Sequence, residues 1–159
     1  MVIGIIILVV AVAVIAFGGD KGFDTVDDLG GVVDTSTTPS VQSIATAIAT
    51  AEGFYVAGSR PARNHNPGDM TQDLIGKSTG KDGAFVTYDT DVDGFENLYA
   101  QVNAWLSGTS KHASSSSTIT DISSFYTTDF PPGAQASWAS TVANQLGVDP
   151  STQLGDING

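Results

Sequence analysis

The longest apolar stretch of the chain is its beginning, Met1 to Phe17 (MVIGIIILVVAVAVIAF), which contains no charged or polar side chain. Seventeen residues are at the lower end of what crosses a bilayer core as a helix, so we predict a transmembrane signal anchor. A cleaved signal peptide is the alternative, with Val14 and Ala16 as the small residues before the cut. A helix buried in a globular core fits the pattern less well, because the run has no polar face to turn towards water.

The next segment, residues 18–39, is rich in Gly, Asp and Thr and has few large apolar side chains. This composition predicts a flexible acidic linker. Lys21 in this linker lies between Asp20 and Asp24, so the flanking charge does not fix how the anchor is oriented in the membrane. We therefore expect one folded domain over residues 40–159.

Four segments of this domain repeat apolar residues at helical spacing. The first covers Ser40 to Glu52, and the second runs from Phe95 to Leu106. A short third helix begins near Thr120, and the fourth covers Gln135 to Leu146. The three longer helices are each followed by a glycine, which is typical of a helix C-terminus: Gly53, Gly108 and Gly147.

The segment between the first two predicted helices differs from them in composition. Residues 58–83 are rich in Gly, Pro and Asn, which predicts a long polar loop of the kind that carries function. Ala84 to Tyr88 (AFVTY) is typical of a strand. Four helices, one strand region and a long loop predict a small α+β domain that is mostly helical.

Composition narrows the function classes. The chain has 159 residues, a mass of 16.3 kDa and 17 acidic against 6 basic side chains, for a formal net charge of -11. Six basic side chains are too few to neutralise a phosphate backbone. Nucleic acid is therefore not an expected partner. The chain has no cysteine, which excludes disulfides and thiolate metal sites, and His65 and His112 are too isolated to form a metal site. We predict neither a metal nor a cofactor.

One acidic run resembles a metal-binding loop. Residues 89–94 (DTDVDG) copy the first half of a calcium loop, D-x-D-x-D-G, but Ala100 stands where the bidentate Glu should be. The pattern therefore favours a strand-to-helix turn with Asp93 near the helix cap over a strong calcium site. Weak calcium binding is the alternative.

Glu52 differs from the other acids because it lies on an apolar helix face. It follows Val41 by eleven positions, which places the two about 20° apart around a helix. A carboxyl turned towards the core at a helix C-terminus meets desolvation and the negative end of the helix dipole, and both raise its pKa. A carboxylic acid that stays protonated near neutral pH can act as a general acid on a glycosidic oxygen. The alternative is that the last helical turn opens to solvent and Glu52 is an exposed terminal residue.

Several segments resemble one family. They are Ala47 to Phe54 (AIATAEGF), Pro61 to Met70 (PARNHNPGDM), residues 93–102 (DGFENLYAQV), Thr118 to Tyr126 (TITDISSFY) and Trp138 to Val148 (WASTVANQLGV). Together they resemble the lysozyme-like peptidoglycan-cleaving domains of bacteriophages and bacteria, which share a broad superfamily with goose-type lysozymes and soluble lytic transglycosylases. The resemblance covers about residues 40–154.

The resemblance implies a muramidase that cuts the β-1,4 bond between N-acetylmuramic acid and N-acetylglucosamine, as a lysozyme or as a lytic transglycosylase. Glu52 would be its general acid and then its base, because in such families this role belongs to the glutamate that ends the first long helix. Glycosidases usually use two carboxylates, and four acids are candidates for the second, none of which the sequence singles out: Asp69, Asp73, Asp82 and Asp89.

Five further residues are candidate substrate contacts. Asn64 and Asn66 could hydrogen-bond the N-acetyl groups of a glycan, although asparagine is also an ordinary turn residue. Phe85, Tyr88 and Tyr126 could line the cleft, because sugar rings stack on aromatic faces, although each also suits a core. Tyr126 ranks first, because the resembling enzymes bring a tyrosine from a late helix towards the acid.

The resemblance also implies partners and a location. The expected partners are peptidoglycan glycan strands and, through residues 1–17, a membrane. The domain would act outside the cytoplasm or in the membrane of a phage virion, where it would open the cell wall. The rival hypothesis is a catalytically inactive lysozyme-like module that binds glycan or serves as a structural virion membrane protein.

Overall fold

The computed structural model describes residues 39–126 and 133–158. The predicted anchor at 1–17 and the predicted linker, except for its last residue, lie outside the described residues. Within the described ranges, no helix is long and apolar enough to cross a membrane.

The helices follow the apolar periodicity of the sequence. The three longer ones are α1 (Pro39–Ala51), α3 (Asp91–Leu106) and α5 (Ala134–Leu146), and α4 (Ile119–Tyr126) is short. All four predicted helices are confirmed, with bounds that differ from the prediction by at most four residues. Two single-turn elements were not predicted, α2 (Arg60–Arg63) and the 3-10 helix η1 (Leu154–Asp156), because they are too short to show a period.

The predicted strand is one half of a β-hairpin. Strand β1 (Gly80–Asp82) pairs antiparallel with β2 (Phe85–Thr87), with Lys81 opposite Val86. The fold is therefore α+β, about half helical, with a sheet of two strands. The sequence did not predict β1, because all three of its residues are exposed and show no apolar alternation.

The acidic run at residues 89–94 is the capped start of α3. The Thr90 Oγ1 accepts a hydrogen bond from the Asp93 backbone N–H at 3.2 Å, and the Thr90 hydroxyl donates to Asp93 Oδ2 at 2.6 Å. This reciprocal cap begins the helix at Asp91, earlier than predicted, and uses Asp93 near the cap as expected. Within residues 39–126 and 133–158, no group of three or more His, Cys, Asp or Glu side chains is placed to hold a metal ion.

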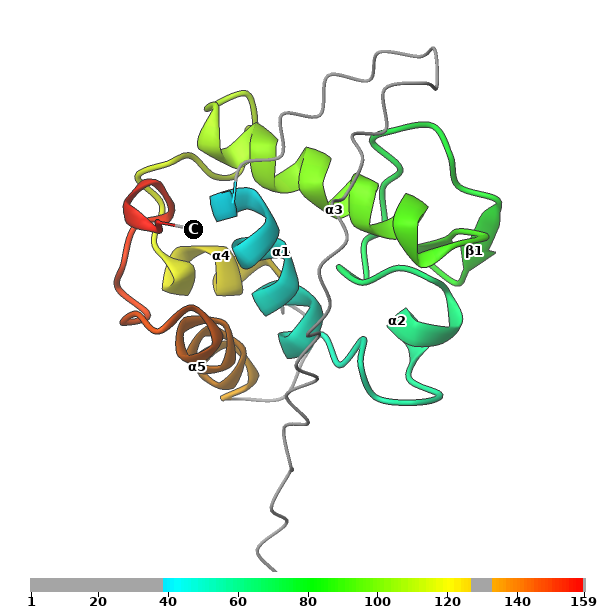
Figure 1. Cartoon of the computed structure of the whole chain (residues 1–159), viewed down its shortest axis with the longest axis horizontal. Coiled ribbons are helices and arrows are strands. Elements are labelled where there is room, and N and C mark those ends of the chain that lie inside the picture. The colour runs from blue at the N-terminus through cyan, green and yellow to red at the C-terminus, as the bar shows by residue number, and fades with distance from the viewer. Residues whose placement is uncertain (1–38, 127–132, 159) are drawn as a thin grey trace, which may run out of the picture. The chain divides into compact units, whose positions relative to one another are not determined.

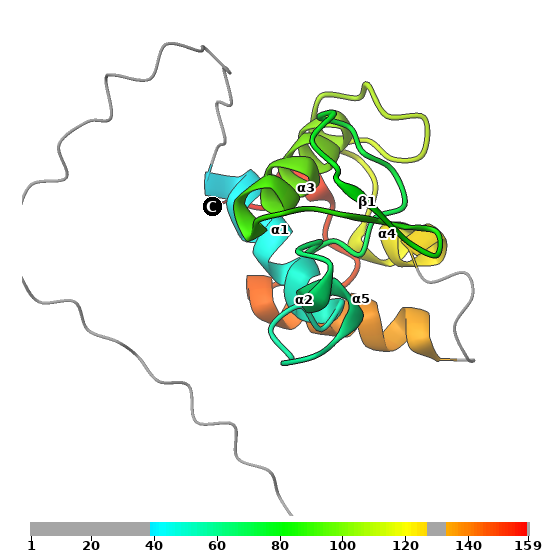
Figure 2. The ribbon, with the colours of Figure 1, turned by 90° about the vertical axis from the view of Figure 1, so that its right-hand side faces the viewer.

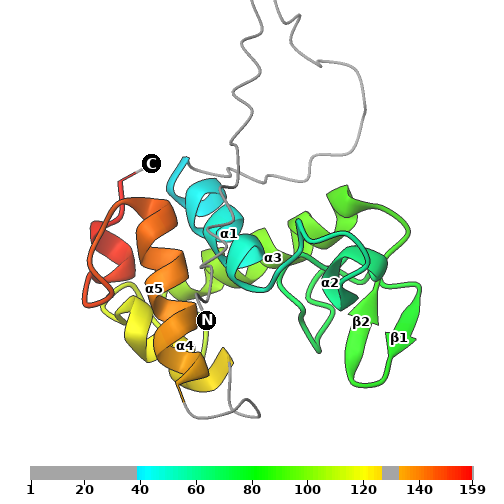
Figure 3. The ribbon, with the colours of Figure 1, turned by 90° about the horizontal axis from the view of Figure 1, so that it is seen from below.

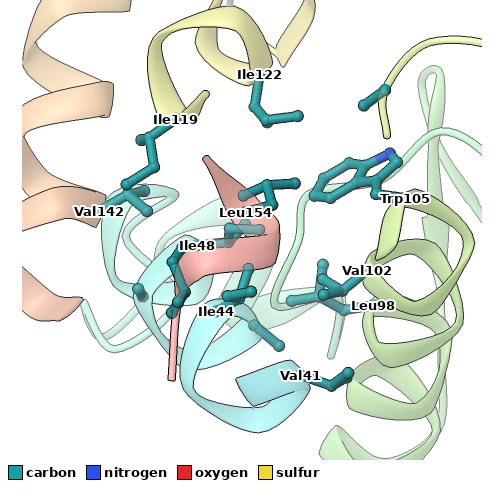
Figure 4. Close-up of a cluster of buried hydrophobic side chains, with 14 of the residues drawn as sticks. Val41, Ile44, Ile48, Leu98, Val102, Trp105, Ile119, Ile122, Val142 and Leu154 are labelled. Carbon is teal, nitrogen blue, oxygen red and sulfur yellow. The ribbon is translucent and has the colours of Figure 1, made fainter. Parts of the chain in front are cut away.

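The core forms where α1 packs against α3 and α5. Val41, Ile44 and Ile48 form the buried stripe of α1. Figure 4 shows this stripe facing side chains from α3, α4, α5 and η1, which are Leu98, Val102, Trp105, Ile119, Ile122, Val142 and Leu154. Because the core lies along one face of α1, it fixes the direction in which residues at the end of that helix point.

The elements lie on two sides of α1. Figure 1 shows α3 crossing α1, and Figure 3 shows α4 and α5 on one side of α1 and α2 with the hairpin on the other. Figure 2, which views the domain from the hairpin side, shows α2 close to the C-terminal end of α1. The end of α1 is thus the point where the helical side and the hairpin side of the domain meet.

Candidate active site

A cavity of about 370 Å³ lies at the end of α1. It opens between that helix end, the start of α2 and the first two turns of α5. Its lining combines carboxylates, hydroxyls and one cation: Ala51, Glu52, Ser59, Arg60, Pro61, Asp69, Ala134, Ser137, Trp138 and Thr141. Among the predicted site residues, Glu52 lies in this lining, and so does Asp69 from the four candidate second carboxylates.

Glu52 is the first residue after α1, and its backbone N–H still donates to the Ile48 carbonyl at 2.9 Å. The helical turn therefore extends through Glu52, and Gly53 then reverses the chain at a φ of +76°. Glu52 Oε1 accepts a hydrogen bond of 2.6 Å from the indole Nε1 of Trp138 on α5. This confirms the prediction from periodicity that Glu52 faces the packed side of the helix, and it rules out the alternative of a freely exposed side chain.

The surroundings of Glu52 hold its carboxyl in the protonated form up to neutral pH. Burial raises the pKa of Glu52 from its ordinary value of 4.5 to about 7, against the Trp138 hydrogen bond, which lowers the pKa by stabilising the carboxylate. The negative charge of Asp69 raises the pKa further, and the positive charge of Arg60 lowers it. Half of the Glu52 side chains therefore carry a proton near pH 7, as a general acid at that pH requires.

Asp69 and Arg60, which also line the cavity, form an ion pair. The Arg60 Nε donates to both carboxylate oxygens of Asp69, at 3.0 and 3.2 Å, and the Arg60 Nη2 also donates to Oδ2. The Arg60 guanidinium lies over the ring of Phe85, with 3.4 Å from Cζ to the ring centroid. Phe85 therefore does not line the cavity but contacts Arg60, which does. This cation–π contact holds the guanidinium in place.

The loop before Asp69 is held by Asn66, whose side chain is fully buried. The Asn66 Nδ2 donates to the carbonyls of Met70 and Val86, both at 2.9 Å, and its Oδ1 accepts from the Met70 N–H at 3.0 Å. The Asp69 N–H closes the turn on the Asn66 carbonyl at 2.9 Å. All three partners of the amide are backbone groups of the protein, so Asn66 positions Asp69, and a contact of Asn66 with a glycan stays a prediction without support from its position.

The other predicted polar residues lie away from the cavity. Asn64 is buried, and its Nδ2 donates to Asp82 Oδ2 at 3.3 Å. Asp73 accepts hydrogen bonds from three backbone N–H groups of its own loop. Asp89 is exposed just before the cap of α3. That these residues contact a glycan or act as the second carboxylate stays a prediction without support from their positions.

The two predicted tyrosines differ in their relation to the site. Tyr126 stacks on Trp138, with ring centroids 5.1 Å apart, and a Cβ placed on Gly68 would lie 3.2 Å from the Tyr126 hydroxyl. Burial and the negative charges of Glu52 and Asp69 raise its pKa. Among the described residues its hydroxyl has no hydrogen-bond partner.

Tyr88 is also buried, but it does not line the cavity. Its backbone N–H donates to the Asn64 carbonyl at 2.9 Å. Tyr126 is therefore the predicted aromatic residue that lies behind the cavity wall, and Tyr88 belongs to the packing of the hairpin side.

The sequence did not predict the two side chains that hydrogen-bond the carboxylates of the site, Trp138 and Arg60. Trp138 lies on the apolar stripe of α5, which made it a core residue by its pattern, although its indole N–H needs an acceptor when buried. Arg60 is one of only six basic residues in the chain and stands in the predicted functional loop, which was a usable signal. The partner of each residue depends on the tertiary fold.

A comparison of the chain with models of known protein families, with curated protein sequences and with solved structures found no match.

Proposed function

We propose that this protein is a muramidase that cleaves the β-1,4 bond between N-acetylmuramic acid and N-acetylglucosamine in peptidoglycan, with Glu52 as its general acid. The observation that carries the proposal is the state of Glu52. Its carboxyl lies at a cavity and is partly buried, and burial raises its pKa to about 7. These are the properties that a general acid for a glycosidic oxygen requires.

The chemistry begins with the proton on Glu52. As the bond between the anomeric carbon and the bridging oxygen breaks, this proton passes to the oxygen, which leaves as a hydroxyl. The Glu52 carboxylate then takes a proton from the group that attacks the anomeric carbon. That group is water in a lysozyme and the sugar's own hydroxyl in a lytic transglycosylase, which closes an anhydro ring.

The ion pair favours a mechanism with one acid. Asp69 is the carboxylate that shares the cavity with Glu52, but Arg60 engages both of its oxygens. An acceptor engaged in this way is a poor nucleophile, because the positive charge of Arg60 offsets its negative charge. Asp69 is therefore not the nucleophile in the proposal, and Glu52 serves as both acid and base.

The proposed setting follows from the apolar beginning of the chain. A membrane anchor at residues 1–17 would hold the domain outside the cytoplasm or at a phage virion membrane, next to the cell wall. With a net charge of -11, the protein would approach an anionic wall best where salt screens the repulsion.

The test is zymography of the full-length chain on peptidoglycan, beside two matched variants. Glu52→Gln keeps the shape of the side chain and removes the proton donor. Glu96→Gln changes the one other glutamate of the chain, which lies on α3, pairs with Lys77 and does not line the cavity. We expect clearing by the unchanged protein and by Glu96→Gln, and none by Glu52→Gln.

Two other results would contradict the proposal in different ways. Equal clearing by Glu52→Gln would remove Glu52 from the mechanism. No clearing by any of the three folded proteins, together with retention on peptidoglycan, would favour the inactive glycan-binding module. Mass analysis of the released sugars would then separate anhydro ends from reducing ends.

A further inference from the structure

Trp138 and Glu52 both line the cavity and are joined by a hydrogen bond. It lies in the second turn of α5, its side chain is 6% exposed, and its Nε1–H donates to Glu52 Oε1 at 2.6 Å. The contact joins residues that are 86 positions apart in the sequence. Glu52 itself stands just beyond the last residue of α1, so contacts within its own helix do not hold its side chain.

The indole is itself held in place by packing. One ring face stacks on Tyr126 at 30° between planes, and Tyr126 in turn meets the core residue Trp105 edge to face, with centroids 6.1 Å apart. The helix α5 that carries Trp138 packs against α1 and α4. A donor fixed in this way can orient the flexible side chain that it binds.

The chemistry of the bond distinguishes the two oxygens of the Glu52 carboxyl. An indole N–H can donate but cannot accept, so the oxygen it contacts must be an acceptor in both protonation states. When Glu52 is protonated, its carbonyl oxygen is a stronger acceptor than its hydroxyl oxygen, so the contact favours Oε1 as the carbonyl oxygen and Oε2 as the hydroxyl oxygen. We propose that Trp138 is a positioning residue that reserves Oε1 as an acceptor and so places the transferable proton of Glu52 on Oε2.

The groups around Glu52 leave this role to Trp138. Arg60 comes from α2 and Asp69 from the loop after it, and they engage each other. Tyr126 comes from α4, and α5 contributes no titratable side chain to the cavity. The catalytic consequence of the inference rests on the proposed function, whereas the hydrogen bond and the proton position do not.

The first test is an NMR titration of the full-length chain labelled with ¹⁵N. The chain has two tryptophans, so the indole N–H of Trp105 serves as an internal control, and Trp138→Phe assigns the two signals. We expect the chemical shift of the Trp138 indole proton to move downfield as the pH rises, with a midpoint near pH 7. The reason is that the charged Glu52 carboxylate is a stronger hydrogen-bond acceptor than the protonated acid. The shift should vanish in Glu52→Gln while the Trp138 signal persists. A Trp138 signal that is constant from pH 5 to 9, or that titrates equally in Glu52→Gln, would overturn the inference.

The second test is the pH profile of peptidoglycan cleavage by Trp138→Phe, which keeps an aromatic ring but removes the donor. We expect kcat to fall roughly 10- to 100-fold, the range for a lost hydrogen bond to a charged group, with little change in KM. The alkaline limb of the pH profile should move to higher pH, because the pKa of Glu52 rises when the Trp138 hydrogen bond that stabilises its carboxylate is lost. A limb that moves to lower pH would show that Trp138 only excludes water, and an unchanged kcat would overturn the positioning role.

The two tests separate the inference from the proposed function. If the unchanged protein fails to cleave peptidoglycan but the Trp138 signal follows Glu52, the hydrogen bond stands and the proposed function fails. If cleavage depends on Glu52 but the Trp138 signal does not titrate, the proposed function stands and the inference fails.

Discussion

Replacing Glu52 by Gln should make the protein more stable at alkaline pH. In the unfolded chain the carboxyl has its ordinary pKa of 4.5, and in the folded protein burial raises the pKa to about 7. Between these values the folded state keeps a proton that the unfolded state has released. The free energy of unfolding therefore falls as the pH rises from about 4.5 to about 7, and stays lowered above that.

The size of the effect follows from the two pKa values. One pKa unit corresponds to about 1.4 kcal/mol, so the raised pKa of Glu52 lowers the stability by up to about 3 kcal/mol above pH 7. Glutamine resembles the protonated acid, and its carbonyl oxygen can still accept the Trp138 N–H. Glu52→Gln should therefore match the unchanged protein near pH 4 and exceed it by up to about 3 kcal/mol at pH 8.

The assay is urea unfolding between pH 4 and 9, followed by tryptophan fluorescence, with the slope against urea checked for constancy. Glu96→Gln is the control, because it also removes one carboxylate but leaves the cavity unchanged. Its stability should stay parallel to that of the unchanged protein across this range. If the difference between Glu52→Gln and the unchanged protein is the same at pH 4 and pH 8, then Glu52 is not desolvated and the reasoning is wrong.

Two further predictions concern Asp69 and Asn66, the residue that positions it. Asp69→Asn removes a negative charge and leaves the Arg60 guanidinium unpaired, so the pKa of Glu52 should fall below 7, measured by the same NMR titration; an unchanged or higher midpoint would contradict it. Asn66→Ala breaks three buried hydrogen bonds and should lower the free energy of unfolding by about 2 to 4 kcal/mol, whereas Asn144→Ala on the exposed face of α5 should change it little; similar urea midpoints for the two variants would contradict the structural role of Asn66.

The sequence predicted the larger helices well because each buries one apolar face. The stripe of α1 and the glycines after three helices set both the type and the ends of these elements. Strand β1 was not predicted, since it is held by its partner β2 and not by an apolar pattern of its own. The start of α3 was misplaced by the acidic run, whose Thr90 is the actual cap.

The site was predictable only where one helix determines it. The face of Glu52 follows from its spacing to Val41, which is a property of α1 alone. Its contact with Trp138 and the pairing of Asp69 with Arg60 join different elements, so no local pattern reveals them. For the same reason, the sequence did not distinguish Asp69 from the other three candidate acids.

In the proposed function Glu52 delivers the proton that breaks the glycosidic bond, and the release of disaccharide fragments from purified peptidoglycan measures this step. The full-length chain and its Glu52→Gln and Glu96→Gln variants would be compared at pH 6, with products quantified by mass spectrometry. We predict release by the unchanged protein and by Glu96→Gln, and a loss of at least about 100-fold for Glu52→Gln, as expected when a general acid is removed. Equal release by Glu52→Gln, with the same fragments, would contradict the claim.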